Sequence, residues 1–357
     1  MFKRRNAVSA LAAAALAVTG FVATTPAHAA AGFVGVILPD AASSNRWETA
    51  DRPFLTAAFK AAGVTAKIQN ANGDKAAFAT IADQMLTQGA KVLVIVNLDS
   101  ASAKAVQDKA KKQGVPTIDY DRLTLNGSES YYVSFDNTAV GVLQGTGIVN
   151  CLKAKGVKNP RIVYLNGSPT DNNATLFAKG YKSVVDPYLK ANGGTVVADQ
   201  AVPNWDNVQG GTIFEQMLTK AGGKLDAVVS ANEGLGLAAV AVLKKNMLNG
   251  KVCVSGQDAT DAGLAAILTG DLSNTVYKAI KAEANATAAL AVSLFKGQKA
   301  TAATGSVNNG TANVPSVLLV PVGITKANVK VVLADGFTTR AKVCAIATDA
   351  VCKAAGL

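Results

Sequence analysis

Residues 91–121, KVLVIVNLDSASAKAVQDKAKKQGVPTIDYD, contain the pattern that decides the fold. KVLVIVN is almost entirely apolar, which predicts a strand buried on both faces of a sheet. SAKAVQDKAKKQG then predicts an amphipathic helix that ends near Gly114, and VPTIDYD predicts a second strand. A strand, a helix and a strand in this order indicate a parallel sheet that is covered by helices.

The same alternation continues on both sides of this stretch. Earlier strands are predicted at GFVGVILP (32–39) and TAKIQNA (65–71), and helices at PFLTAAFKAAG (53–63) and AFATIADQMLTQG (77–89). The pattern restarts with strands at RIVYLNG (161–167), GTVVADQAV (194–202), DAVVSANE (226–233) and KVCVSGQD (251–258). YYVSFDN (131–137) lies between the two series, where we expect a crossover. The sequence therefore predicts an α/β fold with two similar, doubly wound parallel-sheet lobes.

The N-terminus predicts a secretory signal peptide over residues 1–29. Lys3-Arg4-Arg5 precedes an apolar, Ala-rich stretch, and Ala27-His28-Ala29 is a cleavage pattern. No later stretch approaches the roughly 20 apolar residues of a membrane-spanning helix. No Cys lies near the cleavage site, so a lipid anchor is not expected. We therefore expect cleavage near Ala29 and a mature protein in the periplasm.

Composition excludes several kinds of site. The chain has one histidine, His28, and it lies in the predicted leader. A His-based catalytic triad, a His-containing zinc site and a His general base are therefore excluded, and we expect no metal and no cofactor. Removing the leader takes away three of 35 basic residues and none of 24 acidic ones, which lowers the formal charge from +11 to +8. The Lys residues form no dense block, so no nucleic-acid partner is expected.

Four cysteines, Cys151, Cys253, Cys344 and Cys352, suggest disulfides outside the cytoplasm and allow three pairings. Cys344 and Cys352 are near in sequence, but one straight helix would hold them about 12 Å apart, so a bridge requires a turn between them. Cys151 would then pair with Cys253 by elimination. Two buried free thiols are the alternative for that second pair.

Polar residues follow most of the predicted strands. Parallel sheets bind ligands beyond the carboxyl ends of their strands, so these residues are candidates for a site. They are Asn45-Arg46-Trp47, Asp99, Asp121-Arg122, Asp136-Asn137, Asp171 to Asn173, Trp205-Asp206, Asn232-Glu233 and Gln257-Asp258. Carboxylates accept from vicinal hydroxyls, amides donate and accept, guanidinium donates in a planar fork, and an indole offers a flat apolar face. Together these groups favour a carbohydrate site.

Each of these residues also has a simpler interpretation. An Asp or Asn before a helix is commonly an N-cap, so Asp171 could begin a helix at Asn172, and Asp258 could cap ATDAGLAAIL. Tryptophan is more often a core residue than a ligand platform. Asp121 and Arg122 could form a surface ion pair of little consequence. The joint placement of these residues after successive strands favours a site.

Several longer segments resemble one family. YDRL (120–123), YYVSFDNTAVGVLQG (131–145), NGSPTDNNATLF (166–177), VSGQDA (254–259), TVYKAI (275–280) and VNNGTANVPSVLLVPV (307–322) resemble periplasmic sugar-binding proteins of ABC importers, in the pentose-binding branch. The resemblance runs from Val34 to Phe337. It implies two lobes joined by a three-segment hinge, one of residues 30–136 plus 280–313, the other of 137–276 plus 314–330, with a C-terminal tail over 331–357.

The resemblance also implies the sugar contacts. They are Arg46, Trp47, Asp121, Arg122, Asp171, Asn173, Trp205, Asn232, Asp258 and Lys278. Asn172 is then the residue that starts the helix. Two features depart from the family: Glu233 stands where relatives often have Asp, and the residues flanking Arg46-Trp47 vary with the sugar.

The expected function is therefore a monomeric receptor, not an enzyme, that captures a monosaccharide and delivers it to the membrane subunits of an ABC importer. D-xylose is the sugar that the resemblance favours. A broader aldose receptor for glucose, galactose or arabinose, serving transport or chemosensing, is the first alternative. A glycosidase with Asp121 and Asp171 as paired carboxylates is the second, and the excess of amides and arginines over acids argues against it. A DNA-binding repressor is disfavoured because no helix-turn-helix pattern is present.

Overall fold

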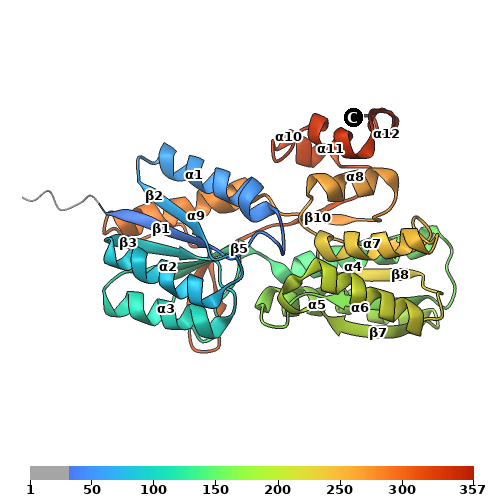
Figure 1. Ribbon diagram of the computed structural model, residues 1–357, viewed down its shortest axis with the longest axis horizontal. Coiled ribbons are helices and arrows are strands. Elements are labelled where there is room, and N and C mark those ends of the chain that lie inside the picture. Colours follow the sequence, from blue (N-terminus) through green and yellow to red (C-terminus); the bar gives the residue numbers. More distant parts are fainter. Residues whose placement is uncertain (1–31) are drawn as a thin grey trace, which may run out of the picture. The chain divides into compact units, whose positions relative to one another are not determined.

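The computed structural model describes residues 32–357, so the predicted leader lies outside the described residues. The described chain forms a seven-stranded and a four-stranded β-sheet, both mainly parallel and packed with helices, and a separate two-stranded pair (Figure 1). This arrangement confirms the prediction of an α/β fold with two doubly wound lobes. No helix among residues 32–357 combines the length and apolar character that crossing a membrane requires.

The first sheet has seven strands in the order β11-β12-β5-β4-β3-β1-β2. All neighbours are parallel except β11 and β12. The strands are β1 (Phe33–Leu38), β2 (Ala66–Asn70), β3 (Ala90–Ile95), β4 (Thr117–Tyr120), β5 (Tyr131–Phe135), β11 (Gly305–Asn308) and β12 (Asn313–Leu319). The helices are η1 (Trp47–Asp51), α1 (Arg52–Ala61), α2 (Lys75–Thr87), α3 (Ser100–Lys112) and α9 (Ile280–Phe295).

Alternate side chains of the central strands pack on opposite faces of this sheet. Val34 and Val36 of β1 join the apolar cluster under α1 and α9, which includes Leu55. Phe33 and Ile37 of the same strand join the cluster under α2 and α3. A strand buried on both faces reads as a continuous apolar run, which is why FVGVIL shows no polar alternation.

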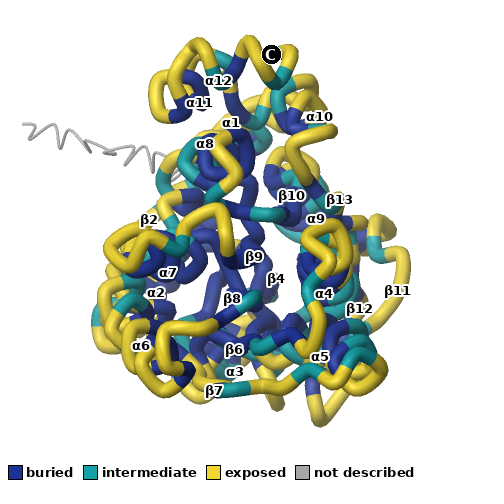
Figure 2. The backbone as a smooth tube through the Cα atoms, turned by 90° about the vertical axis from the view of Figure 1, so that its right-hand side faces the viewer, coloured by how far each residue is buried: buried dark blue, intermediate teal, exposed yellow. Residues whose placement is uncertain are grey.

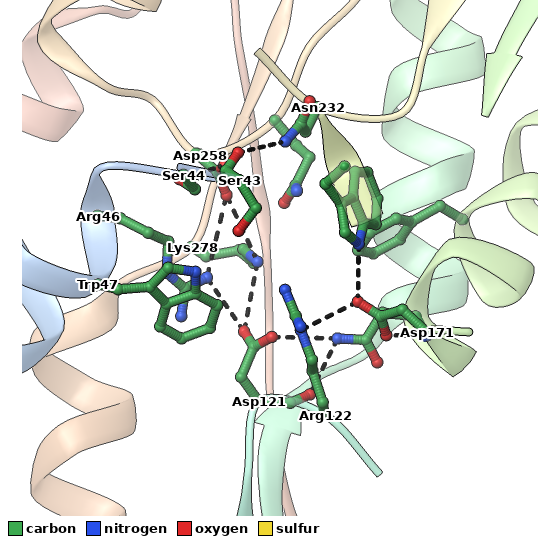
Figure 3. A pocket seen from close by; sticks show the side chains of 14 residues that line it. Ser43, Ser44, Arg46, Trp47, Asp121, Arg122, Asp171, Asn232, Asp258 and Lys278 are labelled. Carbon is green, nitrogen blue, oxygen red and sulfur yellow. Dashed lines mark hydrogen bonds and ion pairs between the residues drawn. The ribbon is translucent and has the colours of Figure 1, made fainter. Parts of the chain in front are cut away.

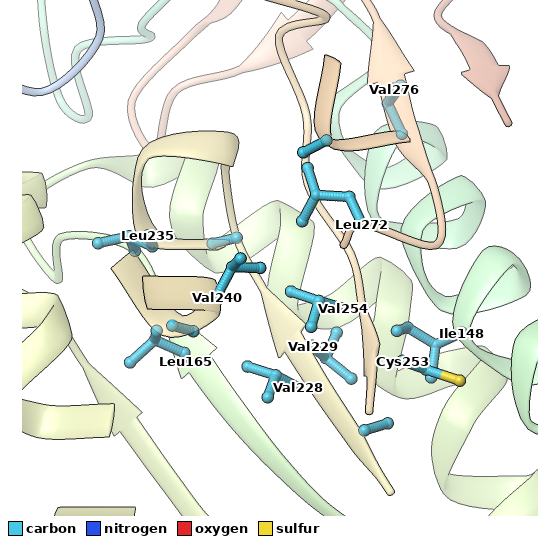
Figure 4. Packing of buried hydrophobic residues seen from close by; sticks show 14 of the residues in the cluster. Ile148, Leu165, Val228, Val229, Leu235, Val240, Cys253, Val254, Leu272 and Val276 are labelled. Carbon is cyan, nitrogen blue, oxygen red and sulfur yellow. The ribbon is translucent and has the colours of Figure 1, made fainter. Parts of the chain in front are cut away.

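The second lobe has a four-stranded parallel sheet, β7-β6-β8-β9, and a separate antiparallel pair, β10-β13. The strands are β6 (Arg161–Asn166), β7 (Thr195–Ala201), β8 (Ala227–Ser230), β9 (Cys253–Val254), β10 (Thr275–Tyr277) and β13 (Val322–Ile324). The helices are α4 (Asn137–Ala154), α5 (Asn172–Ala191), η2 (Pro203–Trp205), α6 (Asn207–Lys220), α7 (Glu233–Lys245) and α8 (Asp261–Thr269). Their apolar side chains fill one core between sheet and helices (Figure 4), and Figure 2 shows the buried strands inside a more exposed layer of helices.

The chain passes between the two lobes three times. It crosses after β5, after β10 and after β12. The last crossing differs from the sequence-based boundary at 313/314, because β12 hydrogen-bonds to β5 as far as Leu319. Residues 314–319 therefore belong to the first sheet. The position of β12 between β11 and β5, which the sequence does not reveal, decides this.

Both predicted disulfides are present. Cys151 in α4 is bonded to Cys253 in β9, and Cys344 in α11 (Arg340–Ala347) to Cys352 in α12 (Asp349–Ala354). The required turn lies at Thr348, whose φ of 79° is left-handed. The segment expected to be a tail thus forms α10 (Lys330–Ala334) and these two helices, which pack against the second lobe.

Close packing of α4 on α5 positions two helix starts at the edge of the sheet. A Cβ at Gly141 would lie 2.1 Å from the carbonyl oxygen of Phe177, and one at Gly180 would lie 2.3 Å from that of Thr138. Only glycine allows the helices to approach so closely. Asn137 and Asn173, at the starts of α4 and α5, therefore meet, and Asn137 Nδ2 donates to Asn173 Oδ1 at 2.9 Å.

Candidate functional site

A polar cavity lies where loops of both sheets meet at the carboxyl ends of the strands (Figure 3). Its volume is about 30 Å³, room for roughly two water molecules. All the residues that the resemblance implied as sugar contacts lie on its wall: Arg46, Trp47, Asp121, Arg122, Asp171, Asn173, Trp205, Asn232, Asp258 and Lys278. They come from segments spread over more than 230 positions of the chain, and the fold brings all of them together.

Arg46 is the centre of the charged groups on the side of the first sheet. It lies at the start of η1 and is 3% exposed. Its guanidinium is bidentate to Asp51, with Nε–Oδ2 3.0 Å and Nη2–Oδ1 2.9 Å. Nη1 lies 3.0 Å from Asp121 Oδ2, and Nη2 lies 3.4 Å from Glu283 Oε2. The planar guanidinium therefore contacts three carboxyl groups from separate elements, which are η1, the loop after β4, and α9.

The buried carboxyl groups do not all carry charge. Burial opposes the charge of Asp121, but Arg46, Lys278 and Arg122 hold the pKa of its carboxyl well below its usual range. Burial, together with the Asp121 carboxylate, raises the pKa of Glu283 well above its usual value. The surroundings therefore favour the anionic form of Asp121 at the cavity wall and the protonated form of Glu283 behind it.

The backbone at Asp121 is left-handed, with φ of 63°. Its carbonyl oxygen accepts three hydrogen bonds, from Tyr132 Oη at 3.1 Å, Ser134 Oγ at 2.8 Å and Asn173 Nδ2 at 3.0 Å. Tyr132 and Ser134 belong to β5, while Asn173 belongs to the second lobe. These donors compensate for an unfavourable backbone conformation and direct the Asp121 carboxylate into the cavity.

Trp47 provides the one large apolar surface on this side. Its indole ring lies 4.2 Å from the Arg46 guanidinium and 5.4 Å from that of Arg122. Cation–π attraction of this kind orients a ring that also packs into the core of the first lobe. Trp47 is therefore both a core residue of the first lobe and part of the cavity wall.

Asp171 combines two roles on the side of the second sheet. As N-cap of α5 it accepts the backbone N–H of Asn173 at 2.9 Å. Its Oδ2 also accepts from Trp205 Nε1 at 3.1 Å and lies 3.0 Å from Arg122 Nε, which comes from the first sheet. Asp121 and Arg122 therefore do not form a surface pair with each other; both are buried and pair with other residues.

Asn232, Asp258 and Lys278 complete the wall. Asn232 caps α7 by accepting Leu235 N–H at 2.9 Å. Asp258 does not cap α8, because Thr260 is the N-cap of that helix; the Asp258 carboxylate instead lies 3.5 Å from Lys278 Nζ. Lys278 Nζ is also 3.4 Å from Asp121 Oδ2, so this one cation lies between carboxylates of both lobes.

A protein-family profile described as "Periplasmic binding protein domain" matches residues 34–299. The chain belongs to the periplasmic binding protein family. Over 312 residues this binding protein is 36% identical to the D-xylose-binding periplasmic protein of Escherichia coli (strain K12), covering 87% of this chain and 92% of that one.

Two further relatives support the assignment. The multiple sugar-binding periplasmic receptor ChvE of Rhizobium radiobacter is 34% identical over 348 residues, which cover 93% of the binding protein and 97% of ChvE. A solved structure of an ABC transporter solute binding protein from Clostridium phytofermentans, with bound β-D-glucose, has a TM-score of 0.79 and 28% identity, covering 87% of this chain and 99% of that one. These relatives are binding proteins and receptors by name, and the family is one of substrate-binding proteins rather than enzymes.

Sequence reasoning did not single out three wall residues of the binding protein: Ser43, Ser44 and Phe177. Gln257 was among the polar residues after strands, but the resemblance did not include it. Phe177 lies four residues after Asn173 in α5, so helical spacing was the signal that places both on one face. Ser43 and Ser44 belong to a loop without regular structure, where no pattern identifies them.

Some buried polar atoms at the wall have no hydrogen-bond partner within the described residues. They are Trp47 Nε1, a donor, and Gln257 Oε1, an acceptor. A buried polar atom without a partner is costly, so these atoms are available to a ligand that both donates and accepts. Hydroxyl groups meet that requirement. Asp121, held as an anion by three cations, is unsuited to donate a proton as a glycosidase acid would.

Proposed function

We propose that this protein captures a monosaccharide, D-xylose by preference, in the cavity between its lobes and delivers it to the membrane subunits of an ABC importer. The observation that carries the proposal is the convergence of carboxylates, amides, cations and two indoles from both sheets on one small polar cavity. We further propose that the protein works as a monomer in the periplasm, after cleavage of the leader near Ala29.

The chemistry of the wall supports a sugar in particular. Asp121 and Asp171 can each accept two hydroxyl protons, while Arg46, Arg122 and Lys278 can each donate to a hydroxyl oxygen. Trp47 and Trp205 add flat apolar faces for the C–H side of a sugar ring. A pentose is preferred because the D-xylose-binding protein of Escherichia coli shares 36% of aligned residues with this chain.

Binding and release follow from the division of the site between two lobes. Because the wall residues belong to both, a sugar bridges them and favours the arrangement in which both sets of contacts form. A sugar that lacks a hydroxyl leaves a buried polar group unpaired, and this discriminates between similar sugars. The closed surface is then the form that importer subunits recognise.

A broader aldose receptor is the second candidate. The observations that favour it are the 34% identity to a receptor named for multiple sugars and the structural similarity to a protein with bound glucose. In that case the same residues would bind the ring, and the cavity would widen near Trp47 and Trp205 to admit a sixth carbon.

Calorimetric titration of the mature protein with D-xylose, L-arabinose, D-ribose, D-glucose and D-galactose tests the proposal. Tight one-to-one binding of D-xylose alone supports the pentose receptor, and comparable binding of several aldoses supports the broader one. Asp171→Asn should weaken binding, whereas Asp83→Asn, at an exposed ion pair with Lys109, should not. Failure of all five sugars to bind would contradict both candidates.

A further inference from the structure

The loop that carries Asp258 has an unusual backbone. Asp258 has φ of 118° and the next residue, Ala259, has φ of 54°, and neither is a glycine. Side chains other than glycine rarely adopt positive φ, and two in succession require compensation from their surroundings. Asp258 and the preceding Gln257 are the residues of this loop that line the sugar cavity.

Glu233 supplies that compensation. Its Oε1 accepts the backbone N–H of Ala259 at 2.8 Å and the hydroxyl of Thr275. Its Oε2 accepts the backbone N–H of Thr260 at 2.8 Å and the Thr260 hydroxyl at 2.5 Å. Each carboxylate oxygen therefore bonds one backbone N–H of the strained loop, so the carboxylate holds the loop at two successive residues.

The surroundings of Glu233 are shaped to hold this side chain. Glu233 is 1% exposed. A Cβ at Gly263 would lie 2.0 Å from its Cδ, and one at Gly256 would lie 2.8 Å from its Cγ. Both neighbours must be glycine for the glutamate side chain to pass between them, so α8 and the end of β9 are adapted to a long acidic residue at this position.

Glu233 also reaches three segments that line the cavity. It follows Asn232 directly at the start of α7. It bonds the two residues after Asp258, and through Thr275 it contacts β10, three positions before Lys278. Glu233 itself is not on the wall of the sugar cavity.

We propose that Glu233 is a positioning residue for sugar binding, which holds the Asp258 loop in its left-handed conformation and ties it to the segments of Asn232 and Lys278. This inference rests on the proposed function, because it assigns Glu233 a part in the same sugar site. Glu233 is not among the sugar contacts that the resemblance implies, and it does not line the cavity.

Two variants separate this role from general stabilisation. Glu233→Gln keeps the size of the side chain, but an amide has one oxygen, so its NH₂ group must face the N–H of Ala259 or that of Thr260. Glu233→Asp keeps two acceptor oxygens on a shorter side chain. Glu215→Gln is a matched control, since Glu215 is an exposed residue of α6 in the same lobe.

Hydrogen–deuterium exchange of the sugar-free protein tests the anchoring of the loop. We expect Glu233→Gln to raise exchange in residues 256–263, Glu233→Asp to raise it less, and Glu215→Gln to leave it unchanged. Equal exchange in wild type and Glu233→Gln would overturn the proposal. This measurement needs no ligand, so it remains decisive if the wild-type protein binds none of the five sugars and the proposed function fails.

Calorimetry then tests the link to the sugar. We expect Glu233→Gln to raise the Kd for D-xylose roughly tenfold to a hundredfold, Glu233→Asp to raise it less, and the control to match wild type. If Glu233 acts through Asp258, Glu233→Gln should also change relative affinities for the five sugars in the same order as Asp258→Asn. An unchanged Kd, or an equal loss for every sugar while Asp258→Asn discriminates among them, would refute the positioning role.

Discussion

At the residue scale, Arg46 is the cation that compensates for the burial of several acidic side chains at the site. This one guanidinium contacts Asp51, Asp121 and Glu283 while almost fully buried. Taking a charge out of water is costly, and the cost is offset only while its partners remain in contact. Lysine could not replace it, because one ammonium cannot form the bidentate bond to Asp51 while also contacting Asp121.

Arg46→Met should therefore destabilise the protein by about 3–5 kcal/mol, because it leaves Asp51 buried without its cation and removes the nearest cation from Asp121. Urea denaturation monitored by circular dichroism measures this loss. Arg340→Met is the control, since Arg340 pairs with Asp349 while both side chains are largely exposed, and a pair of that kind contributes about 0–1 kcal/mol. Equal losses of stability in the two variants would show that Arg46 contributes no more than an exposed ion pair does.

The raised pKa of Glu233 predicts how the free energy of unfolding depends on pH. Burial and the neighbouring Asp258 carboxylate raise the pKa of Glu233 to about 8, whereas an unfolded glutamate titrates near about 4.3. The native state then keeps a proton that the unfolded state has lost. Facing the hydroxyl of Thr260 or Thr275, this proton leaves both carboxyl oxygens able to accept the backbone N–H groups of Ala259 and Thr260. This contribution is complete below about pH 4.3 and disappears as pH rises through about 8.

The free energy of unfolding should accordingly fall between pH 5 and pH 8, by up to about 1.4 kcal/mol per pH unit for this group. Burial also raises the pKa values of Glu283, Asp119 and Asp258, so the part of the slope that belongs to Glu233 is the difference between wild type and Glu233→Gln. Thermal and urea unfolding across this range measure the slope. Glu233→Gln, which cannot titrate, should reduce it, whereas Glu215→Gln should not. A slope unchanged in Glu233→Gln would show that Glu233 is ionised throughout.

The polar residues that follow strands predicted where the cavity lies, but they did not predict which of these residues line it. Asp99, Asp136 and Asp206 also follow strands, yet they are N-caps of α3, α4 and α6 and lie outside the cavity. Asp171 is both a cap and a wall residue. A cap and a ligand group share the same sequence pattern, because both follow a strand and precede a helix. Only the spatial arrangement separates them.

At the scale of elements, most predicted strands show an apolar run in the sequence. Length alone does not decide the outcome, because the two residues of β9 were predicted within KVCVSGQD, whereas the seven residues of β12 were not predicted as a strand. The six residues of β1 and of β3 were predicted from sequence. The short strands β10 and β13, with three residues each, were not, because so few residues show no periodicity. β10 nonetheless positions Lys278, so one cavity residue depends on an element that pattern alone does not predict.

The two disulfides join elements at very different separations in sequence. Cys151–Cys253 closes a loop of 102 residues between α4 and β9, whereas Cys344–Cys352 closes one of 8 residues between α11 and α12. Closing a longer loop removes more entropy from the unfolded chain, about 4.7 kcal/mol near 100 residues and less than about 3 kcal/mol below 15 residues.

Replacing Cys151 and Cys253 together with Ala should thus lower stability more than replacing Cys344 and Cys352 together. Urea denaturation of the two double variants under identical conditions gives both values. Sugar affinity serves as the control, since none of the four cysteines lines the cavity. The expectation fails if removal of the short-loop disulfide costs as much as removal of the long-loop one.

At the scale of the whole molecule, contacts between the lobes exist both inside and outside the cavity. Inside it, Arg122 pairs with Asp171, and Asn173 bonds Asp121. Outside it, Asn207 Nδ2 at the start of α6 donates to the carbonyl oxygen of Ala42 at 3.2 Å. The cavity enclosed by these contacts is smaller than a sugar. Sugar entry therefore requires the lobes to separate at the three crossings, and every contact between lobes affects that equilibrium.

Asn207→Ala should weaken sugar binding without removing a cavity residue. The lost hydrogen bond favours the closed arrangement but touches no ligand, so we expect D-xylose affinity to fall roughly two- to tenfold. Calorimetry measures the affinity, and small-angle scattering should show the same radius of gyration as wild type once sugar saturates both. Asn249→Ala is the control, because the Asn249 side chain bonds Asp271 within one lobe. If Asn207→Ala and the control bind equally well, contacts outside the cavity do not contribute to closure, and closure depends on the cavity residues alone.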